Sequence, residues 1–172
     1  AAVAQLRLKR NEYREALNLF SIAQQGVPQY TSWYLEYTYY ALLCKQKLKE
    51  AFTTADHQQA QSAIEQGRFL FARESAKNDF TDRFTGLLCL LQHRFADAIP
   101  FLQAARPKLA DFDLVATDQA LILCYLQTRQ FEQAKAIAQQ GMANGGEFAG
   151  RYRALLDALP ALESSLKAGS NS

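Results

Sequence analysis

The chain has 172 residues, enough for one domain with a sizeable core, and 49% of them are hydrophobic. The formal net charge is +2, with basic and acidic residues interspersed, which excludes a strong field for nucleic acid or an anionic membrane. No apolar run reaches the ~18 residues of a membrane span. We therefore expect neither nucleic-acid binding nor direct membrane insertion.

The N-terminal stretch AAVAQLRLKR lacks an initiator Met and carries its charges after a short apolar part, unlike a signal peptide. We expect it to begin inside a helix, as a piece of a longer chain, and we expect a cytoplasmic location. Apolar residues recur at helical spacing, and Gly and Pro fall between the segments, so the sequence predicts an all-α protein. Asn11 opens a helical segment that Gly26 and Pro28 close. A helix at about 31–51 and another at about 57–77 are expected next.

Polar residues, Gly and Pro mark the later boundaries. Asp56, with Gln59 three residues on, predicts a capping box at the start of the helix near 57. Further breaks are expected at Asn78 and Asp79, at ADFD (110–113), at NGG (144–146) and near Pro160. The last helix is expected at 147–158, and residues 165–172 are expected to form a flexible tail.

Three cysteines, Cys44, Cys89 and Cys124, each lie in an apolar run. Their odd number and wide spacing argue against a disulfide framework or a zinc site. We interpret them as small buried hydrophobes. Free thiols favour a reducing compartment.

Four segments of the chain align with one another, and in each an aromatic residue or Leu is followed three residues later by Ala. The pairs are Tyr13/Ala16, Leu48/Ala51, Phe95/Ala98 and Phe131/Ala134. The intervals between the Ala positions are 35, 47 and 36 residues. Two of these intervals are close to the period of about 34 residues found in tetratricopeptide repeats.

The chain resembles the tetratricopeptide repeat (TPR) family over roughly residues 1–143. Ala16, Phe20 and Pro28 fit the second-helix pattern of the family, and Gly86 stands at its small first-helix position. The second repeat departs from the pattern and is longer. The resemblance implies a TPR-like α-solenoid of antiparallel helix pairs with about four repeats, the second extended. Helix 147–158 would cap it, within a single domain of residues 1–164.

Nothing in the sequence indicates an enzyme. It has no phosphate-binding glycine loop, no dinucleotide fingerprint, no H-E-x-x-H and no C-x-x-C motif. His57 and His93 both lie next to predicted turns, and the helix that holds Cys89 is expected to end before His93. We expect no catalytic residue, no cofactor and no metal.

The TPR resemblance implies that the first helix of each pair lines a concave face that binds a peptide or a partner helix. Aligning the first helices predicts which residues belong to that face. They are Gln5, Leu8, Lys9, Trp33, Glu36, Tyr40, Leu43, Phe80, Arg83, Leu87, Gln119, Leu123 and Gln127, with Tyr37 beside them. The expected partner-binding residues are Trp33, Tyr37, Tyr40, Phe80, Arg83 and Leu123. Leu35, Tyr39 and Leu42 form a separate stripe that we assign to the core.

This face is aromatic and only lightly charged, unlike the Lys, Arg and Asn clamp of TPR co-chaperones that hold an acidic C-terminus. The sequence therefore predicts a hydrophobic or amphipathic partner segment. The leading hypothesis is a non-enzymatic interaction module, an adaptor domain of a larger, bacterial protein. One alternative is a chaperone similar to class II type III secretion chaperones, and another is a self-associating structural spacer. The partner, the pathway and the oligomeric state stay open.

Overall fold

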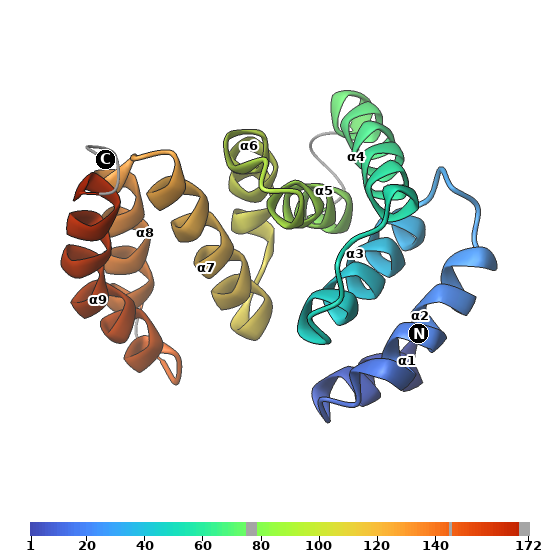
Figure 1. Ribbon diagram of the computed structural model, residues 1–172. Helices are drawn as coiled ribbons and strands as arrows, with labels where there is room; N and C mark the ends of the chain where they lie inside the picture. Colours follow the sequence, from blue (N-terminus) through green and yellow to red (C-terminus); the bar gives the residue numbers. More distant parts are fainter. Residues whose placement is uncertain (75–78, 145, 169–172) are drawn as a thin grey trace.

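The computed structural model describes residues 1–74, 79–144 and 146–168, and every regular element within them is helical (Figure 1). The all-α prediction is confirmed. The helices are α1 (Ala2–Lys9), α2 (Tyr13–Gln25), α3 (Ser32–Lys47), α4 (Thr54–Glu74), α5 (Asp79–Leu91), α6 (Phe95–Ala105), η1 (Arg106–Lys108, a 3₁₀ turn), α7 (Asp111–Gln127), α8 (Phe131–Ala143) and α9 (Ala149–Ala168).

The same tight turn ends α1, α3, α5 and α7; it leads directly into α2, α6 and α8, and through a longer connection into α4. In each, one residue takes a left-handed backbone conformation: Asn11 (φ 61°), Lys49 (φ 57°), His93 (φ 56°) and Arg129 (φ 59°). The N–H of the following residue donates to the carbonyl of the residue five positions before it, at 2.8–3.0 Å. This is the bond that closes a Schellman motif. The structure therefore repeats one helix–turn–helix unit four times.

This shared turn corrects one sequence alignment. Tyr13, Phe95 and Phe131 each stand two residues after the left-handed residue and begin a helix. Leu48 stands one residue before Lys49 and caps the C-terminal end of α3, and Ala51 lies in the connection to α4. The pair Leu48/Ala51 is therefore not equivalent to the other three pairs, because the second connection is longer.

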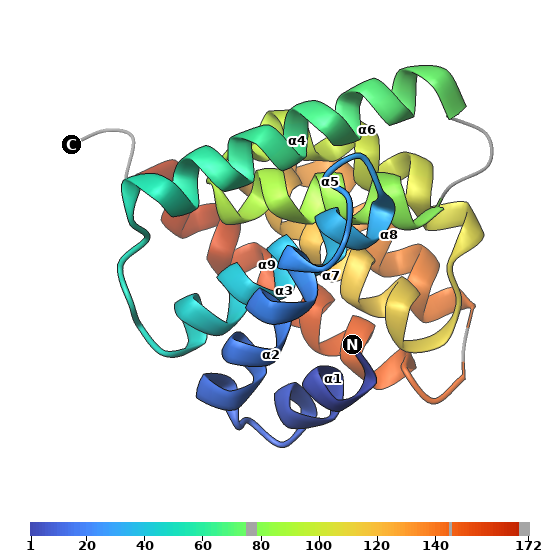
Figure 2. The same cartoon turned by 90° about the vertical axis from the view of Figure 1, so that its right-hand side faces the viewer.

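The helices follow one another across the molecule, from α1 and α2 at one end to α8 and α9 at the other (Figure 1). Each helix packs on the next, and the backbones of α3, α5, α7 and α9 also approach one another in series. On the other side, α4 meets α6 through long side chains, such as Phe71 and Phe101 with ring centroids 5.0 Å apart. Figure 2 shows α4 lying along the upper edge, with α1 and α2 at the opposite edge. The row is therefore tighter along its odd-numbered helices.

Helix α4 begins earlier than the sequence predicts, and its capping box has a different register. The N–H of Asp56 donates to Thr53 Oγ1 (3.2 Å), and Asp56 Oδ2 accepts from the backbone N–H of Thr53 (2.8 Å). Thr53 is thus the capping residue, and Asp56 is its partner three positions on. Gln59, the expected partner of Asp56, instead donates to Gln24 on α2 (2.8 Å). Helix α3 ends at Lys47 rather than near 51.

At two positions where the sequence predicts a break between helices, the structure has the first residue of a helix. Asp79 and Asp111 are the first residues of α5 and α7. In α7, Asp111 and Asp113 place carboxylates in the first turn, where they interact favourably with the positive end of the helix dipole. Asn78 and Gly145 lie outside the described residues.

Helix α9 is longer than the expected helix 147–158. It passes through Pro160 and continues to Ala168, into the segment expected as a tail. Pro160 is exposed, while Leu159 is buried and Leu166 packs against the core. Burial of this apolar face holds the helix together across the single backbone donor that proline removes. Residues 169–172 lie outside the described part.

The core has two clusters of buried side chains. The smaller is built around Phe20 and joins α1, α2 and α3, and the larger extends from α3 to α9. Tyr40 packs against both clusters. The cysteines Cys44, Cys89 and Cys124 are fully buried and free, as expected. Burial raises the pKa of each thiol, to about 11, 11 and 12 respectively.

Candidate functional site: a groove along the odd-numbered helices

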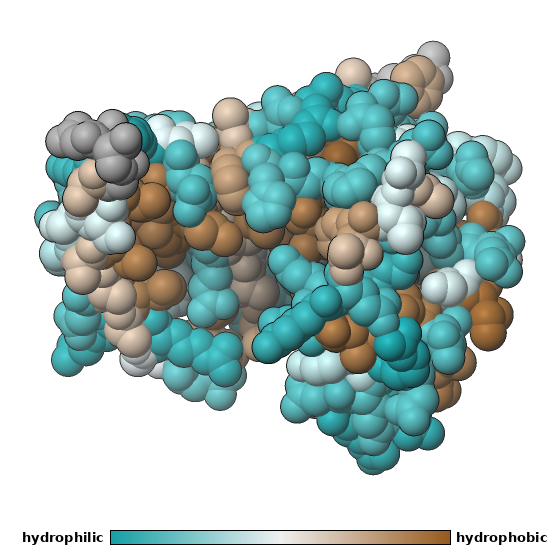
Figure 3. Space-filling model, in the orientation of Figure 1, coloured by the Kyte–Doolittle hydropathy of each residue, from teal (hydrophilic) through white to brown (hydrophobic). Residues whose placement is uncertain are grey.

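A groove of about 660 Å³ runs along α1, α3, α5 and the first turns of α7. Its lining combines aromatic, aliphatic and charged side chains. The residues are Gln5, Leu8, Lys9, Glu36, Tyr39, Tyr40, Leu43, Phe80, Arg83, Phe84, Leu87, Ala110, Asp111, Phe112, Asp113 and Ala116. Figure 3 shows the molecule indented at its lower edge, between the part that holds α7 to α9 and the part that holds α1 and α2, with apolar side chains visible at depth.

Four aromatic rings from α3 and α5 form one wall of the groove. Phe84 lies at their centre, with ring centroids 5.6 Å from both Tyr39 and Tyr40 and 6.5 Å from Phe80. Tyr40 also stacks on Phe20 at 5.0 Å, which fixes the wall to the smaller core cluster. Aromatic pairs at these separations stabilise one another beyond their buried area. The wall is therefore a preformed surface that large apolar groups can contact.

Two aromatic side chains of the groove are exposed: Phe80, which belongs to the wall, and Phe112 on α7. Phe80 is 54% exposed and Phe112 is 58% exposed, although both line the groove. Large hydrophobic side chains held open beside a concave surface are typical of binding sites rather than of a packed interior.

Charged groups lie among the aromatic rings. Gln5 on α1 donates to Glu36 Oε1 on α3 at 2.9 Å, and Glu36 is only 6% exposed. Burial raises the pKa of the Glu36 carboxyl above its ordinary value, although the Gln5 hydrogen bond and the Arg83 charge act in the opposite direction. The site therefore holds an acid whose ionised form is poorly solvated.

Arg83 is the buried cation of the groove. Its Nη2 lies 2.8 Å from Asp113 Oδ1, across the gap between α5 and α7. Its guanidinium also lies 5.6 Å from the ring centroid of Phe84. Its Nε is buried and has no hydrogen-bond partner among the described residues.

The two central tyrosines stay neutral near physiological pH. Burial raises the pKa of both Tyr39 and Tyr40 to about 12. Their contribution to the groove is thus an apolar ring with a polar tip, which suits recognition of an amphipathic surface.

The six expected partner-binding residues lie in different places. Tyr40, Phe80 and Arg83 line the groove together. Trp33 is 55% exposed and packs beside Tyr37 (6.2 Å between centroids), outside the groove lining. Tyr37 is buried against Phe20, and Leu123 is exposed on α7, also away from the groove.

Several groove residues are absent from the sequence-based set of partner-binding residues. Tyr39 was assigned to the core, but it lines the groove and packs on the larger cluster at the same time. Asp111, Phe112 and Asp113 were assigned to a break between helices. The pair of acidic residues flanking Phe112 could have indicated that this segment begins a helix, since acidic residues favour the first turn of a helix.

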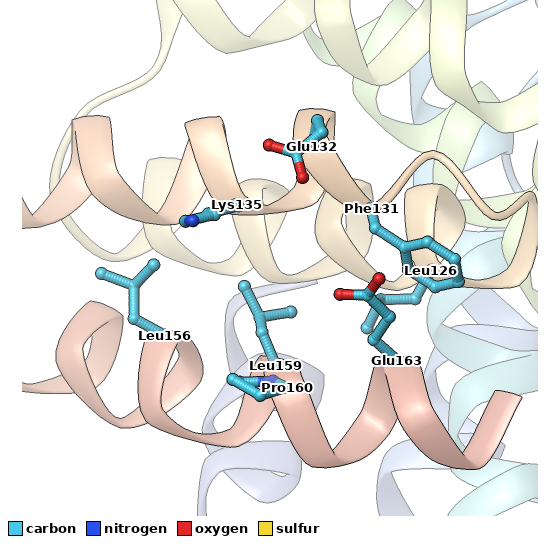
Figure 4. A pocket seen from close by; sticks show the side chains of 8 residues that line it. All are labelled: Leu126, Phe131, Glu132, Lys135, Leu156, Leu159, Pro160 and Glu163. Atoms are coloured by element: carbon cyan, nitrogen blue, oxygen red, sulfur yellow. The ribbon is translucent and has the colours of Figure 1, made fainter. Parts of the chain in front are cut away.

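A second, smaller pocket of about 110 Å³ lies between α8 and α9 (Figure 4). Leu156 and Leu159 of α9 face Lys135 of α8 across it, and Glu163 borders it. Glu163 already pairs with Lys167 on its own helix. The pocket is too small to hold more than a single side chain, so it is a weaker candidate than the groove.

The residues considered for catalysis are not brought together. Cys89 is buried in α5, and His93 is exposed in the turn after that helix. His57 is also exposed, and its Nδ1 lies 2.6 Å from Gln92 Oε1. Within the described ranges, no three His, Cys, Asp or Glu side chains gather as a metal site requires.

The described helices include none with the length and hydrophobicity to cross a bilayer. No protein-family model, curated protein or solved structure matches the chain. The class that the fold and the groove define is an all-helical protein built from repeated helix–turn–helix units with a lined groove on one side.

Proposed function

We propose that this protein is a non-enzymatic interaction module of the TPR type, and that it binds a segment of another polypeptide in the groove along its odd-numbered helices. The observation that carries the proposal is the groove itself. It combines a preformed aromatic wall with two exposed phenylalanines, Phe80 and Phe112. A surface of this composition, with a few polar groups at its centre, suits a protein segment with bulky apolar side chains.

Two features support the assignment to a TPR-type solenoid. The four turns repeat one backbone geometry, and the sequence repeats an aromatic residue and Ala in three of the four units. Small residues also lie where helices come close. A Cβ on Gly86 of α5 would lie 2.7 Å from Leu102 Cγ of α6, so this contact needs glycine. Such units bury their apolar faces only by stacking.

The proposal is tested by affinity capture from a lysate of the source cells, with identification of the captured polypeptides by mass spectrometry. The test variant combines Phe80→Ala and Phe112→Ala, which removes both exposed groove rings. The matched control combines Ile22→Ala and Tyr30→Ala, two exposed apolar side chains (66% and 70%) outside the groove. We expect the captured polypeptide to be lost with the groove variant and retained with the control.

Equal capture by the groove variant and by the native chain would place the binding surface elsewhere. Sedimentation of the purified chain at increasing concentration tests the alternative that the chain self-associates through the groove. A mass that rises with concentration in the native chain but not in the groove variant would identify a second copy as the occupant.

A further inference from the structure

We propose that the groove selects a partner segment in which a cationic side chain, Lys or Arg, lies beside a bulky apolar residue. This inference rests on the proposed function, because it names the chemistry of the segment that the groove would hold. The carboxylate of Glu36 is the group that receives the cation.

Glu36 is a buried acid whose carboxylate can accept more hydrogen bonds than it receives. It is 6% exposed and lines the groove, and the Gln5 amide donates to its Oε1. In the part of the chain that the structure describes, no hydrogen bond reaches its second oxygen, Oε2. A carboxylate normally accepts several hydrogen bonds, and one that is largely removed from water is poorly stabilised when ionised. A cation entering the groove would supply an opposite charge and donors to Oε2 in place of water.

The neighbouring cation does not fill this role. Arg83 lies close enough to influence Glu36 electrostatically, but its ion pair is with Asp113 on α7 at 2.8 Å. Burial still outweighs the favourable contacts, so the pKa of the Glu36 carboxyl stays raised. The pairing between Arg83 and Asp113 leaves Glu36 without an ion pair of its own among the described residues, although the Gln5 hydrogen bond and the charges of Arg83 and the N-terminal amine partly offset its burial.

The groove lining as a whole also carries more negative than positive side chains, which favours a cationic partner. Three acids, Glu36, Asp111 and Asp113, face two bases, Lys9 and Arg83. The positive end of α7 offsets part of the charge of Asp111 and Asp113, which belong to its first turn. Glu36 lies beyond the first turn of α3, where the helix dipole offsets less of its charge. Complementary charge chiefly sets which segments are accepted.

The rival chemistry is an acidic segment. Such a segment would displace Asp113 and pair with Arg83, whose Nε has no partner among the described residues. It would also bring a second negative charge towards Glu36. Like charges brought together in a desolvated site are unfavourable, so we expect acidic segments to be rejected.

The test is a selection of random twelve-residue peptides displayed on phage against the immobilised full chain. Recovered peptides are then synthesised with a fluorescent label, and their Kd is measured by polarisation. We expect them to share a Lys or Arg close to an aromatic residue or Leu. Glu36→Gln keeps the acceptor for Gln5 but removes the charge, and it should raise the Kd about tenfold or more. Glu15→Gln, at an exposed position on α2, is the matched control and should leave the Kd unchanged.

Two results would overturn this inference alone. One is recovery of apolar peptides that need Phe80 but have no basic residue and bind Glu36→Gln as tightly as the native chain. The other is recovery of acidic peptides that depend on Arg83. Failure to recover any peptide whose binding depends on Phe80 and Phe112 would count against the proposed function as well.

Discussion

Two buried carboxylates, Glu36 and Asp56, experience opposite environments. Asp56 is 6% exposed, but Lys45 and the N–H and hydroxyl of Thr53 all donate to it. Burial alone would raise its pKa, and these hydrogen bonds together lower the pKa below its ordinary value. Glu36 is equally buried but has fewer donors, and its pKa is raised. The first acid stabilises the fold when ionised, and the second carries a cost when ionised.

Asp56→Asn should lower the free energy of unfolding by about 1–2 kcal/mol near pH 7, because it removes a charged acceptor from Lys45 and Thr53. A lowered folded-state pKa gives stability that is present above the unfolded value of about 3.9 and lost as the pH falls through the folded value. The difference between variant and native chain should therefore shrink towards about pH 3. Urea titrations at both pH values measure it. Asp157→Asn, at an exposed position on α9, should change nothing, and an equal loss there would contradict the account.

Glu36→Gln should act in the opposite direction in the isolated protein. A raised folded-state pKa means that the ionised carboxyl costs stability above that pKa, and that the cost disappears as the pH falls. The variant should therefore need more urea to unfold than the native chain near neutral pH, and about the same amount near pH 3. A variant that is less stable at neutral pH would mean that Glu36 serves the fold and not a partner.

Helix packing depends on glycines that local sequence does not distinguish. Gly67 lies inside α4, and a Cβ there would lie 2.0 Å from Thr85 Oγ1 and 2.9 Å from Leu35 Cδ2. Gly150 lies near the start of α9 and has open space around it. Both are helical glycines in the sequence, but only Gly67 is where α3, α4 and α5 meet.

Gly67→Ala should destabilise the protein by about 1–3 kcal/mol, because overpacking outweighs the better helix propensity of alanine. Gly150→Ala is the matched control. It should leave stability unchanged or raise it by up to about 1 kcal/mol. Thermal or urea unfolding followed by circular dichroism compares the two. If both substitutions stabilise the chain, the claim that α4 approaches α3 and α5 closely at Gly67 is contradicted.

Sequence periodicity predicted that the elements are helices better than it predicted where they begin. The helices expected at 31–51 and 57–77 exist, but Thr53, not Asp56, caps α4. Each of these two residues donates its backbone N–H to the side chain of the other, which places the cap one turn earlier. Pro160 was placed at a break, yet the buried face of α9 carries the helix through it. These boundaries depend on tertiary contacts, and a single sequence does not show which residues will be buried by such contacts.

At the scale of the molecule, the two core clusters divide the chain into a smaller part around Phe20 and a larger part from α3 onwards. Each helix contacts mainly its neighbours in the row. Stability in such an arrangement is a sum of local units and their interfaces. Loss of one cluster should therefore leave the far end of the row folded.

Phe20→Ala should destabilise its surroundings by about 3–5 kcal/mol, because it empties the centre of the smaller cluster. In amide hydrogen exchange we expect faster exchange in α1 and α2, with α7 and α8 little changed. Leu121→Ala, in the larger cluster, is the converse variant and should accelerate exchange in α7 and α8. Uniform acceleration across all helices in both variants would show a single cooperative unit instead.

The repeat register predicted much of the groove, because it aligned equivalent faces of the first helices. It assigned Glu36, Tyr40, Phe80 and Arg83 to one surface, and the structure brings them together. It also assigned Trp33 and Leu123, which lie outside the groove. Trp33 lies in the first turn of α3, before the groove lining of that helix begins at Glu36, and Leu123 lies in the second half of α7, whereas only the first turns of α7 line the groove.

The central claim is that the groove along α1, α3, α5 and α7 is where a partner segment binds. A ¹H–¹⁵N correlation spectrum of the labelled chain, recorded during titration with a peptide recovered by the display selection, tests it most directly. The account predicts that the amides that shift first are those of groove residues such as Glu36, Phe80 and Asp113. Shifts confined to the outer helices α2, α4, α6 and α8 would contradict it.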